Sequence, residues 1–384
     1  MTFFAFEPTL QAAHERIKAV RPQEYARTRN ALDGAVTRLS PYLTHGFVSL
    51  PEVYAGVASS YPLDDQHKFV FELGWRAYYR HVWAHLGDGI HQSMHTGLLP
   101  DDAYQPNMPA DVLEARTGIP AIDLAVRDLY DTGYVHNHAR MWLASYTVHL
   151  RKVHWHVGAQ WMLGHLLDGD AASNHLSWQW VAGTSSSKPY LFNADNVAKY
   201  APADWHSPGT VIDTSYEEMD RIAHSAKPIR LHTAGTHSGM QQPGLCAAPP
   251  DAAWLAPDGA LATDRDVWLI HPWSLGAAPQ PPPNGALLIG VGFTQAHAQL
   301  PWSARRWRFI TTGLQAQTPH LWWGNMAQIA QALRVARSIT WQPDPHIALT
   351  LQATRVLAPA PLFEEVKNYC PSFAQWWRRT KIAE

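Results

Sequence analysis

The segment DGDAASNHLSWQW, residues 168–180, places polar and aromatic groups unusually close together. Its thirteen positions hold two carboxylates, one amide and two indoles: Asp168, Asp170, Asn174, Trp178 and Trp180. If a helix begins just after Asp170, Asn174 and Trp178 lie four residues apart on one face, so an amide and an indole can address the same bound ring system. Asp170 then lies at the helix start, where capping of the helix is the simpler explanation for it.

The residues before this segment follow a helical pattern. Apolar side chains recur at intervals of three and four residues in two runs: Phe71, Trp75, Tyr78 and Val82, and then Ile122, Val126, Leu129 and Tyr130. Between such runs, Pro, Gly and Ser interrupt the helices as loops do. We therefore expect an all-α domain over residues 1–205.

The composition changes after this domain. Residues 206–263 are rich in Pro, Gly, Ala and His and lack sustained periodicity, which predicts an irregular linker. Residues 264–384 contain the short apolar runs VWLIHPW, GALLIGVGF and RWRFITTGL and a helical pattern in LWWGNMAQIAQALRVAR. This alternation predicts a small α/β, Rossmann-like domain with a partly parallel sheet. Because GVGF lacks the rest of a dinucleotide fingerprint, no nucleotide site is expected there.

Length and cysteine content exclude several classes of protein. A chain of 384 residues favours two domains over one small module. Cys246 and Cys370 are too few for a disulfide framework or a thiolate zinc site. No uninterrupted apolar segment is long enough to cross a bilayer, and charges interrupt the first apolar residues. We therefore expect a cytoplasmic, monomeric protein without membrane contact.

The charges nearly balance. There are 30 Lys and Arg against 32 Asp and Glu, so the formal net charge is -2. Affinity for nucleic acid would therefore have to come from a local basic patch. Six arginines could form such a stripe, although a solvated face is the simpler interpretation: Arg76, Arg80, Arg305, Arg306, Arg378 and Arg379.

A second informative segment is TGYVHNHARMW, residues 132–142. On a helix, Asn137, Arg140 and Met141 share a face. The planar guanidinium of Arg140 suits a carboxylate, and Asp168 is a plausible partner. A buried structural ion pair is the simpler explanation of these two residues.

A third segment is FELGWRAYYRHVW, residues 71–83, in which Glu72 lies one helical turn from Trp75. Two interpretations stay open. Either this is an ordinary amphipathic helix with a surface pair between Glu72 and Arg76, or the acid lies beside the indole in a dry cleft, where it can hydrogen-bond or protonate a substrate.

Four histidines raise the question of a metal site: His136, His138, His154 and His156. Side chains two residues apart on a helix point in different directions, and no HExxH signature accompanies them. We therefore expect no metal.

Five segments, in this order, resemble the FAD-binding domain of the DNA photolyase and cryptochrome family. They are TRLSPYLTHGFVS, FELGWRAYYRH, TGIPAIDLAVRDLYDTGYVHNHARM, LLDGDAASNHLSWQW and GTSSSKPYLFN, between about residues 25 and 200. Each segment alone is a weak signal, whereas five in family order make chance similarity very improbable. The resemblance implies a bent FAD molecule bound in the helical domain.

The resemblance also assigns residues to this cofactor. Those implied to hold the diphosphate are Tyr25, Thr37, Arg38, Leu39 and Ser40. Hydroxyl and backbone N–H groups at a helix start suit a phosphate. Arg140 and Asp168 are implied to line the flavin, Asp170 to face the flavin or ribose, and Asn174 to lie beside flavin N5. A neutral amide there can hydrogen-bond to a protonated N5 without requiring that proton.

A chain of aromatic rings is a further implication of the resemblance. Trp178 and Trp155 match its first two members, and Tyr104 matches the outermost one across a gap. A tyrosine is harder to oxidise without losing its proton, so photoreduction would be slower or would need another donor. Helix packing is the simpler explanation of Trp155 taken by itself.

The substrate implied by the resemblance is DNA that contains cyclobutane pyrimidine dimers, single-stranded or flipped from a duplex. Family members that split these dimers carry five pocket residues, matched here by Glu72, Trp75, Asn137, Met141 and Trp180. Two indoles can sandwich an extruded dimer. At His138, repair enzymes usually place Arg, so phosphate affinity there would depend on pH. A cryptochrome-like blue-light sensor without repair activity is the alternative function.

Family members usually carry an α/β antenna domain before the FAD domain, which here begins almost at Met1. Residues 264–384 are therefore a candidate for a permuted or degenerate antenna-type domain, because CPSFAQWWRRTK faintly resembles the end of the usual one. The residues do not identify an antenna chromophore, whose nature stays unknown.

Overall fold

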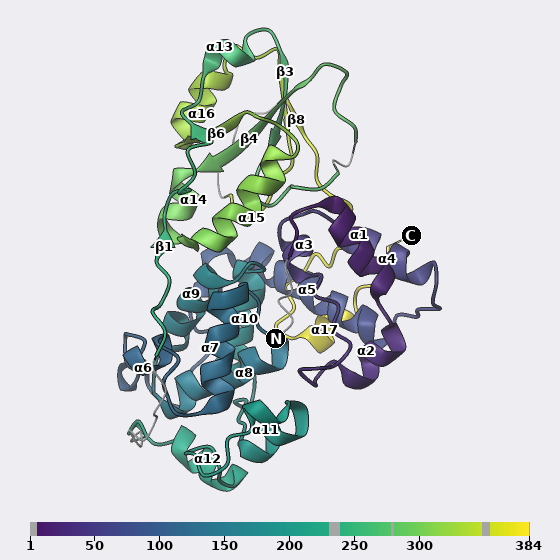
Figure 1. Ribbon diagram of the computed structural model, residues 1–384. Helices are drawn as coiled ribbons and strands as arrows, with labels where there is room; N and C mark the ends of the chain where they lie inside the picture. Colours follow the sequence, from purple (N-terminus) through teal and green to yellow (C-terminus); the bar gives the residue numbers. More distant parts are fainter. Residues whose placement is uncertain (1–5, 230–238, 278–279, 348–353, 384) are drawn as a thin grey trace.

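The computed structural model describes residues 6–229, 239–277, 280–347 and 354–383. Helices form the larger part of the molecule, and a parallel sheet with its own helices lies at one end (Figure 1). The predicted combination of a helical part followed by a small α/β part is confirmed, while its Rossmann-like detail stays a prediction. Among the described residues, no helix combines the length and apolarity needed to span a membrane.

The helical part is built from helices of very different length. They are α1 (Leu10–Ala19), α2 (Pro22–Thr28), α3 (Ser40–Thr44), α4 (Leu50–Ala58), α5 (Lys68–Leu86), α6 (Ala110–Leu113), α7 (Pro120–Thr132), α8 (Asn137–Ser145), α9 (Trp155–His165), α10 (Ala171–Ala182), α11 (Ala194–Tyr200) and α12 (Tyr216–Ala223). Shorter pieces join them: η1 (Gly87–His91), η2 (Asp101–Ala103), the π-helix η3 (Tyr146–Leu150) and η4 (Ala203–Trp205).

Local sequence explains where the helix at the centre of this part begins and ends. The side chain of Asp170 accepts a hydrogen bond from the Ser173 N–H, which caps the start of α10. At the other end, Gly183 has a φ of 77°, a left-handed conformation that glycine adopts without strain. The helix start predicted just after Asp170 is confirmed.

The sheet has six parallel strands in the order β2-β6-β4-β3-β7-β8. They are β2 (Trp254–Leu255), β3 (Asp266–Ile270), β4 (Leu287–Phe293), β6 (Leu321–Gly324), β7 (Ser338–Trp341) and β8 (Arg355–Val356). The accompanying helices are α13 (Gly259–Ala262), α14 (Thr294–Gln299), α15 (Ala304–Gln315) and α16 (Met326–Leu333). β1 (Leu245–Cys246) and β5 (Trp302–Ser303) form a separate antiparallel pair. The central strands β3 and β4 are buried along almost their whole length, as parallel strands usually are.

The structure differs from the predicted bounds of the linker, residues 206–263, and of the α/β domain, residues 264–384. The span 206–263, expected to be an irregular linker, contains α12, β1 and β2, and β2 pairs with β6. Within residues 264–384, α17 (Phe373–Trp377) leaves the sheet and packs against α5 (Figure 1). Two-residue strands have no periodicity to detect, and the surface that receives α17 lies far earlier in the chain. The division into domains stays a prediction.

A buried arginine fastens the sheet part to the helical part. The residue is Arg306, in α15, which is 1% exposed. Its guanidinium donates hydrogen bonds to the carbonyl oxygens of Gly169, at 2.7 Å, and Leu163, at 3.2 Å. These carbonyls belong to the loop between α9 and α10 and to the end of α9. The sheet part therefore holds the loop that carries the predicted site carboxylates.

A second contact between the two parts involves a buried histidine and aromatic packing. The ring nitrogens of His45 lie 2.6 Å from the carbonyl oxygen of Pro272 and 2.8 Å from that of Leu167. Nearby, the rings of Phe47 and Phe309 pack edge to face with centroids 5.7 Å apart. One continuous hydrophobic core thus runs through the sheet and the helices next to it.

The basic stripe considered as a possibility does not form, and the solvated face that was the simpler interpretation holds for only three of the six arginines. Arg306 is buried, and the side chains of Arg76 and Arg80 are only 17% and 26% exposed, because both face the carboxylate of Asp170. The other three arginines of this group are exposed: Arg305, Arg378 and Arg379.

Candidate functional site

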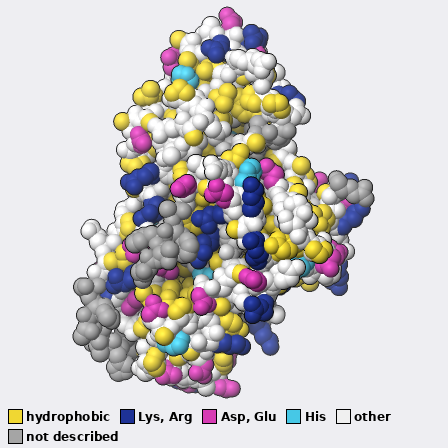
Figure 2. Space-filling view, turned by 45° about the vertical axis from the view of Figure 1, so that its right-hand side comes forward, with side chains coloured by type: hydrophobic (Ala, Val, Ile, Leu, Met, Phe, Trp, Pro, Cys, Tyr) yellow, Lys and Arg dark blue, Asp and Glu magenta, His cyan; other side chains and the backbone are white. Residues whose placement is uncertain are grey.

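A cavity of about 590 Å³ opens among α5, α8, α10 and the residues around α3. Its volume is typical of small-molecule sites, which span roughly 300–1,000 Å³. It is lined by all but two of the residues assigned to the cofactor, the lesion pocket and the aromatic chain: Tyr25, Thr37, Arg38, Leu39, Ser40, Glu72, Trp75, Asn137, Arg140, Met141, Asp168, Asp170, Asn174, Trp178 and Trp180. Lys and Arg side chains gather beside hydrophobic ones in the middle of the face shown in Figure 2.

The cavity lining includes hydroxyl groups and a guanidinium, from Tyr25, Ser40 and Arg38. Burial, and then the nearby carboxylate of Glu72, raise the pKa of Tyr25 well above its ordinary value, so the phenol keeps its proton and can donate it in a hydrogen bond. Arg38 has a φ of 51°, in the left-handed region that residues other than glycine seldom adopt. Ser40 begins α3. A phenol, a guanidinium and a serine hydroxyl form a donor set that suits the oxygens of a diphosphate.

The ion pair expected between Arg140 and Asp168 is present. Nη2 of Arg140 lies 2.9 and 2.7 Å from the two carboxylate oxygens of Asp168, and its Nε donates to the Val135 carbonyl at 2.8 Å. Only 3% of the Asp168 side chain is exposed, against 23% for Arg140. Burial of a carboxylate to this degree is unfavourable unless a partner such as this guanidinium compensates it. Contact of this pair with a flavin stays a prediction.

Asp170 caps α10, as the simpler of its two explanations predicts, and other protein groups also engage its oxygens. Its contact with a flavin or ribose stays a prediction. Its buried carboxylate caps α10 and contacts the guanidinium of Arg80, with Arg76 4.0 Å away. Burial acts to raise the pKa of Asp170, but the two guanidiniums lower it more, and the net shift is downward. Arg80 also reaches Asp344, which follows β7, at 3.5 Å. Asp170 borders the cavity, yet its main contacts join α5, α10 and the sheet part.

Asn174 presents one half of its amide to the cavity. Its Nδ2 donates to the Ala159 carbonyl at 2.8 Å, which joins α10 to α9 and fixes the orientation of the amide. This contact leaves Oδ1 as the acceptor available to a ligand. An N–H group placed at this point, such as a protonated flavin N5, would therefore find an acceptor.

Glu72 lies in a wetter setting than the dry cleft that was one of its two interpretations. A third of its side chain is exposed, and its Oε1 pairs with Arg29 at 3.2 Å and with Lys68 at 3.4 Å. The alternative surface pair with Arg76 is not formed either, because Arg76 turns to Thr44 and Asp170. Arg29 gave no signal in the sequence, since it is separated from Glu72 by 43 positions.

An aromatic residue from α17 supports the indole of Trp75. The ring of Phe373 stacks on it with centroids 4.1 Å apart and an interplanar angle of 10°. Gly74, the preceding residue, accommodates Trp377, since a Cβ at that position would lie 2.3 Å from its ring. The cluster of rings in CPSFAQWWRRTK was the signal that could have revealed this contact.

The remaining pocket residues lie across the cavity on α8 and α10. Trp180 is 38% exposed, and its ring packs near that of Tyr190, with centroids 5.8 Å apart. Nδ2 of Asn137 lies 3.9 Å from Sδ of Met141, as their shared helix face predicts. The structure thus places two indoles, an amide, a thioether and a carboxylate around one opening.

The two predicted residues that do not line the cavity are Trp155 and Tyr104. α9 passes close to the indole of Trp178 only because position 158 is glycine: a Cβ there would lie 2.4 Å from that ring. Trp155, at the start of α9, is 3% exposed and donates its indole N–H to Ser93 Oγ at 2.9 Å.

An imidazole lies between Trp155 and Tyr104. The ring of His154 is 5.8 Å from that of Trp155 and 6.1 Å from that of Tyr104, centroid to centroid. Burial raises the pKa of the Tyr104 phenol. Tyr104 therefore approaches Trp155 through an intervening histidine, and electron transfer along these rings stays a prediction.

His138 does not offer a charged group to a DNA phosphate. It is 8% exposed, and its ring nitrogens contact the Asn30 carbonyl at 2.8 Å and the Tyr190 hydroxyl at 3.1 Å. Burial lowers its pKa, so the ring is neutral at physiological pH. The expected pH-dependent phosphate contact is wrong, because neighbours in the fold enclose this ring.

Known proteins resemble the part of the chain that builds the cavity. Residues 69–214 match the family model of the FAD binding domain of DNA photolyase. A deoxyribodipyrimidine photo-lyase from Streptomyces griseus is 37% identical over 156 residues, 40% of this chain and 33% of that protein. A cryptochrome DASH from Gloeobacter violaceus is 30% identical over 218 residues, 55% of this chain and 42% of that protein.

A solved structure of a cryptochrome from Synechocystis has a TM-score of 0.47 and 27% identity, and the match covers 52% of this chain and 44% of that one. The chain spans less than half the length of the curated relatives it matches.

Proposed function

Because residues 69–214 carry the FAD-binding domain of the DNA photolyase family, we propose that this protein uses light and reduced FAD to repair cyclobutane pyrimidine dimers in DNA. The observation that carries the proposal is the single cavity, which unites the residues expected around the cofactor with the five residues of a lesion pocket. A protein that only bound a flavin would have no physical need for the second group.

The residues present fit FAD. Tyr25, Arg38 and Ser40 would hold the diphosphate, and Asn174 would accept a hydrogen bond from the flavin ring. Ser173 Oγ is buried beside the cavity without a hydrogen-bond partner among the described residues, as expected of a group that a ligand satisfies. When bound and reduced, FAD supplies an electron to the lesion after it absorbs blue light.

The protein's own groups would bind and orient the lesion. Trp75 and Trp180 offer indole faces to the extruded bases, and stacking of this kind contributes about 1–3 kcal/mol per base. Phe373 holds the ring of Trp75 in place. Glu72, whose carboxylate is paired with Arg29 and Lys68, would accept hydrogen bonds from base N–H groups.

A blue-light sensor is the second candidate function. It is supported by the cryptochrome DASH proteins among the similar proteins and by Trp155 and Tyr104, the aromatic residues expected to carry electrons to the flavin. The two functions differ in their need for the lesion pocket, because a sensor requires flavin photochemistry but no affinity for a dimer.

The test compares light with darkness. The purified protein, with its flavin reduced, is mixed with a single-stranded oligonucleotide that contains one thymine dimer, and intact thymines are quantified by chromatography. We expect restoration under blue light and none in the dark. Equal amounts of dimer after both treatments, together with equal affinity for damaged and undamaged strands, would contradict repair and favour the sensor.

A further inference from the structure

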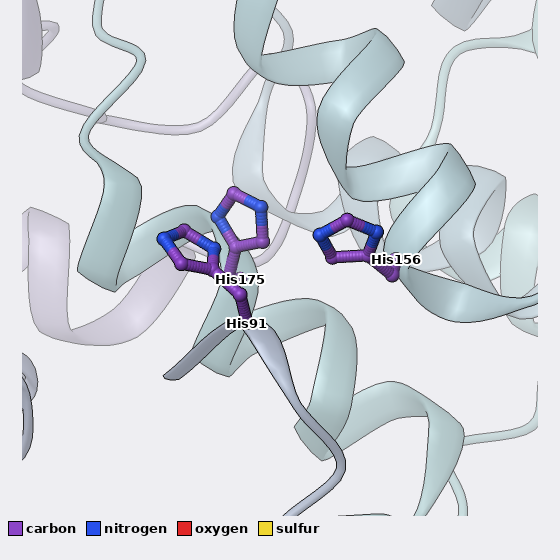
Figure 3. A group of neighbouring side chains, drawn as sticks. All are labelled: His91, His156 and His175. Carbon is purple, nitrogen blue, oxygen red and sulfur yellow. The ribbon is translucent and has the colours of Figure 1, made fainter. Parts of the chain in front are cut away.

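Three histidines from different elements meet in the helical part. His91 ends η1, His156 lies in the first turn of α9, and His175 lies in α10 (Figure 3). Each ring contributes a nitrogen atom, and these atoms lie within 4.8 Å of one another. None of the three lines the cavity described above. The fold alone brings them together.

Two of these rings have nitrogen atoms without hydrogen-bond partners. Nδ1 of His175 contacts the Ala171 carbonyl at 2.9 Å, so this nitrogen carries the hydrogen and Nε2 keeps its lone pair. Nε2 of His175 and Nδ1 of His91 are both buried and, within the described residues, unpartnered. Leaving such atoms unsatisfied is unfavourable, which makes a ligand for them the expected solution. The hydrogen bond from His175 to a carbonyl is also the second contact that metal-bound imidazoles usually make.

The third ring, His156, closes the group. Its centroid lies 6.1 Å from that of His91 and 5.6 Å from that of His175, and the centroids of His91 and His175 are 4.6 Å apart. Its Nε2 is 3.4 Å from the side-chain amide of Gln160, one turn further along α9.

We propose that His91, His156 and His175 bind one Zn²⁺ ion, with a water molecule in the fourth position. Three neutral imidazoles with an open fourth position form a donor set that zinc takes in tetrahedral geometry. With Zn–N bonds of about 2.0–2.1 Å, the ligand nitrogens would lie about 3.4 Å apart, so small ring movements close the group. No carboxylate of the described residues belongs to this group. Because Mg²⁺ and Ca²⁺ prefer oxygen ligands, both ions are disfavoured.

The expectation of no metal rested on histidines close together in sequence. Of the four considered there, only His156 belongs to this group, and its two partners lie 65 positions earlier and 19 positions later. The ion would join η1 to α9 and α10, the helices that carry Trp155 and Asn174.

The direct test measures Zn²⁺ binding to the full chain. Protein stripped of metal with a chelator is titrated with Zn²⁺ by calorimetry, and X-ray absorption at the zinc edge counts the ligands. We expect one tight equivalent with three imidazole nitrogens, and a rise in melting temperature with added Zn²⁺. Absence of a tight equivalent, or a first shell dominated by oxygen, would overturn the proposal.

Variants then locate the site. His91→Gln and His156→Gln remove partly exposed ligands, and we expect each to weaken binding by at least about tenfold. His14→Gln is the matched control, because it removes an exposed histidine of α1, and it should bind like the wild type. Circular dichroism and flavin content verify that each variant is folded. Wild-type affinity in both ligand variants would place the ion elsewhere and overturn the proposal. Since Zn²⁺ binding is measured directly, failure of the repair assay would leave this result unchanged.

Discussion

The wall of the cavity and the loop behind it are held in place by different kinds of contact. The wall is made by neighbouring turns of α5, α8 and α10, whose pairs, such as Asn137 with Met141, follow from helix geometry. The loop that carries Asp168 and Asp170 is held by Arg306, which lies 137 positions after its partner Gly169. A site formed by the helical part therefore depends on the sheet part for the position of its carboxylates.

The largest effect should come from breaking the ion pair in the wall. Arg140→Ala leaves the buried carboxylate of Asp168 without its partner, and removal of one partner from a buried pair costs about 3–5 kcal/mol. Urea unfolding measures the change. Arg221→Ala, which removes an exposed arginine paired with Glu218 on α12, is the control and should leave stability unchanged. A loss for Arg140→Ala of under about 1 kcal/mol would mean that other contacts hold this wall.

The next largest effect tests the backing of the loop. Arg306→Met keeps most of the side-chain volume but leaves the carbonyls of Gly169 and Leu163 buried and unpaired, for an expected loss of about 2–4 kcal/mol. Flavin content should fall as well, because the loop carries Asp168. The neighbouring exposed residue provides the control: Arg305→Met should change stability by less than about 0.5 kcal/mol. Full flavin content in Arg306→Met would show that the site does not depend on the sheet part.

A smaller effect is expected on binding of the lesion. Trp180→Ala removes a partly exposed indole, so the affinity for a dimer-containing strand should fall about 10- to 100-fold, equivalent to about 1–3 kcal/mol of stacking. Fluorescence anisotropy measures the affinity, and flavin absorbance should not change. Tyr216→Ala removes an exposed aromatic ring on α12, outside the cavity, and should bind like the wild type. Equal affinity in both variants would exclude Trp180 from the pocket.

The smallest effect concerns the dependence of folding stability on pH. His149, in η3, contacts the Val181 carbonyl at 2.9 Å, and burial lowers its pKa to about 4. An unfolded histidine titrates near about 6.5, so the unfolded state binds more protons below that pH and stability falls as the pH falls.

Urea unfolding at pH 7 and pH 5 measures this dependence. His149→Gln should reduce the loss of stability between the two pH values by about 1–2 kcal/mol. An unchanged pH dependence in His149→Gln would show that this ring is not among the groups that destabilise the fold in acid.

The sequence allowed the helical part and the composition of the cavity to be predicted, because the information there is local. Helix periodicity placed Asn174 and Trp178 on one face, and the acid before them capped the helix as expected. The pairing of Arg140 with Asp168 could be anticipated from the complementary shapes of the two groups, although 28 positions separate them.

Contacts between distant segments could not be predicted in this way. Nothing near Arg306 in sequence indicates that it is buried, and a surface position was the reasonable expectation for a guanidinium. The phosphate contact expected at His138 fails for a similar reason, since Asn30 and Tyr190, from two other segments, enclose its ring. The group of His91, His156 and His175 exists only after η1, α9 and α10 have packed together.

The stacking of Phe373 on Trp75 has a consequence for biosynthesis. Trp75 is synthesised almost three hundred residues before Phe373, so during translation its indole lacks the ring that stacks on it in the folded protein. The binding wall is completed only after residues 373–377 have been translated and have docked onto α5. A chain that stops before α17 would therefore retain the sequence motifs of the helical part but lack the ring of Phe373 that supports Trp75.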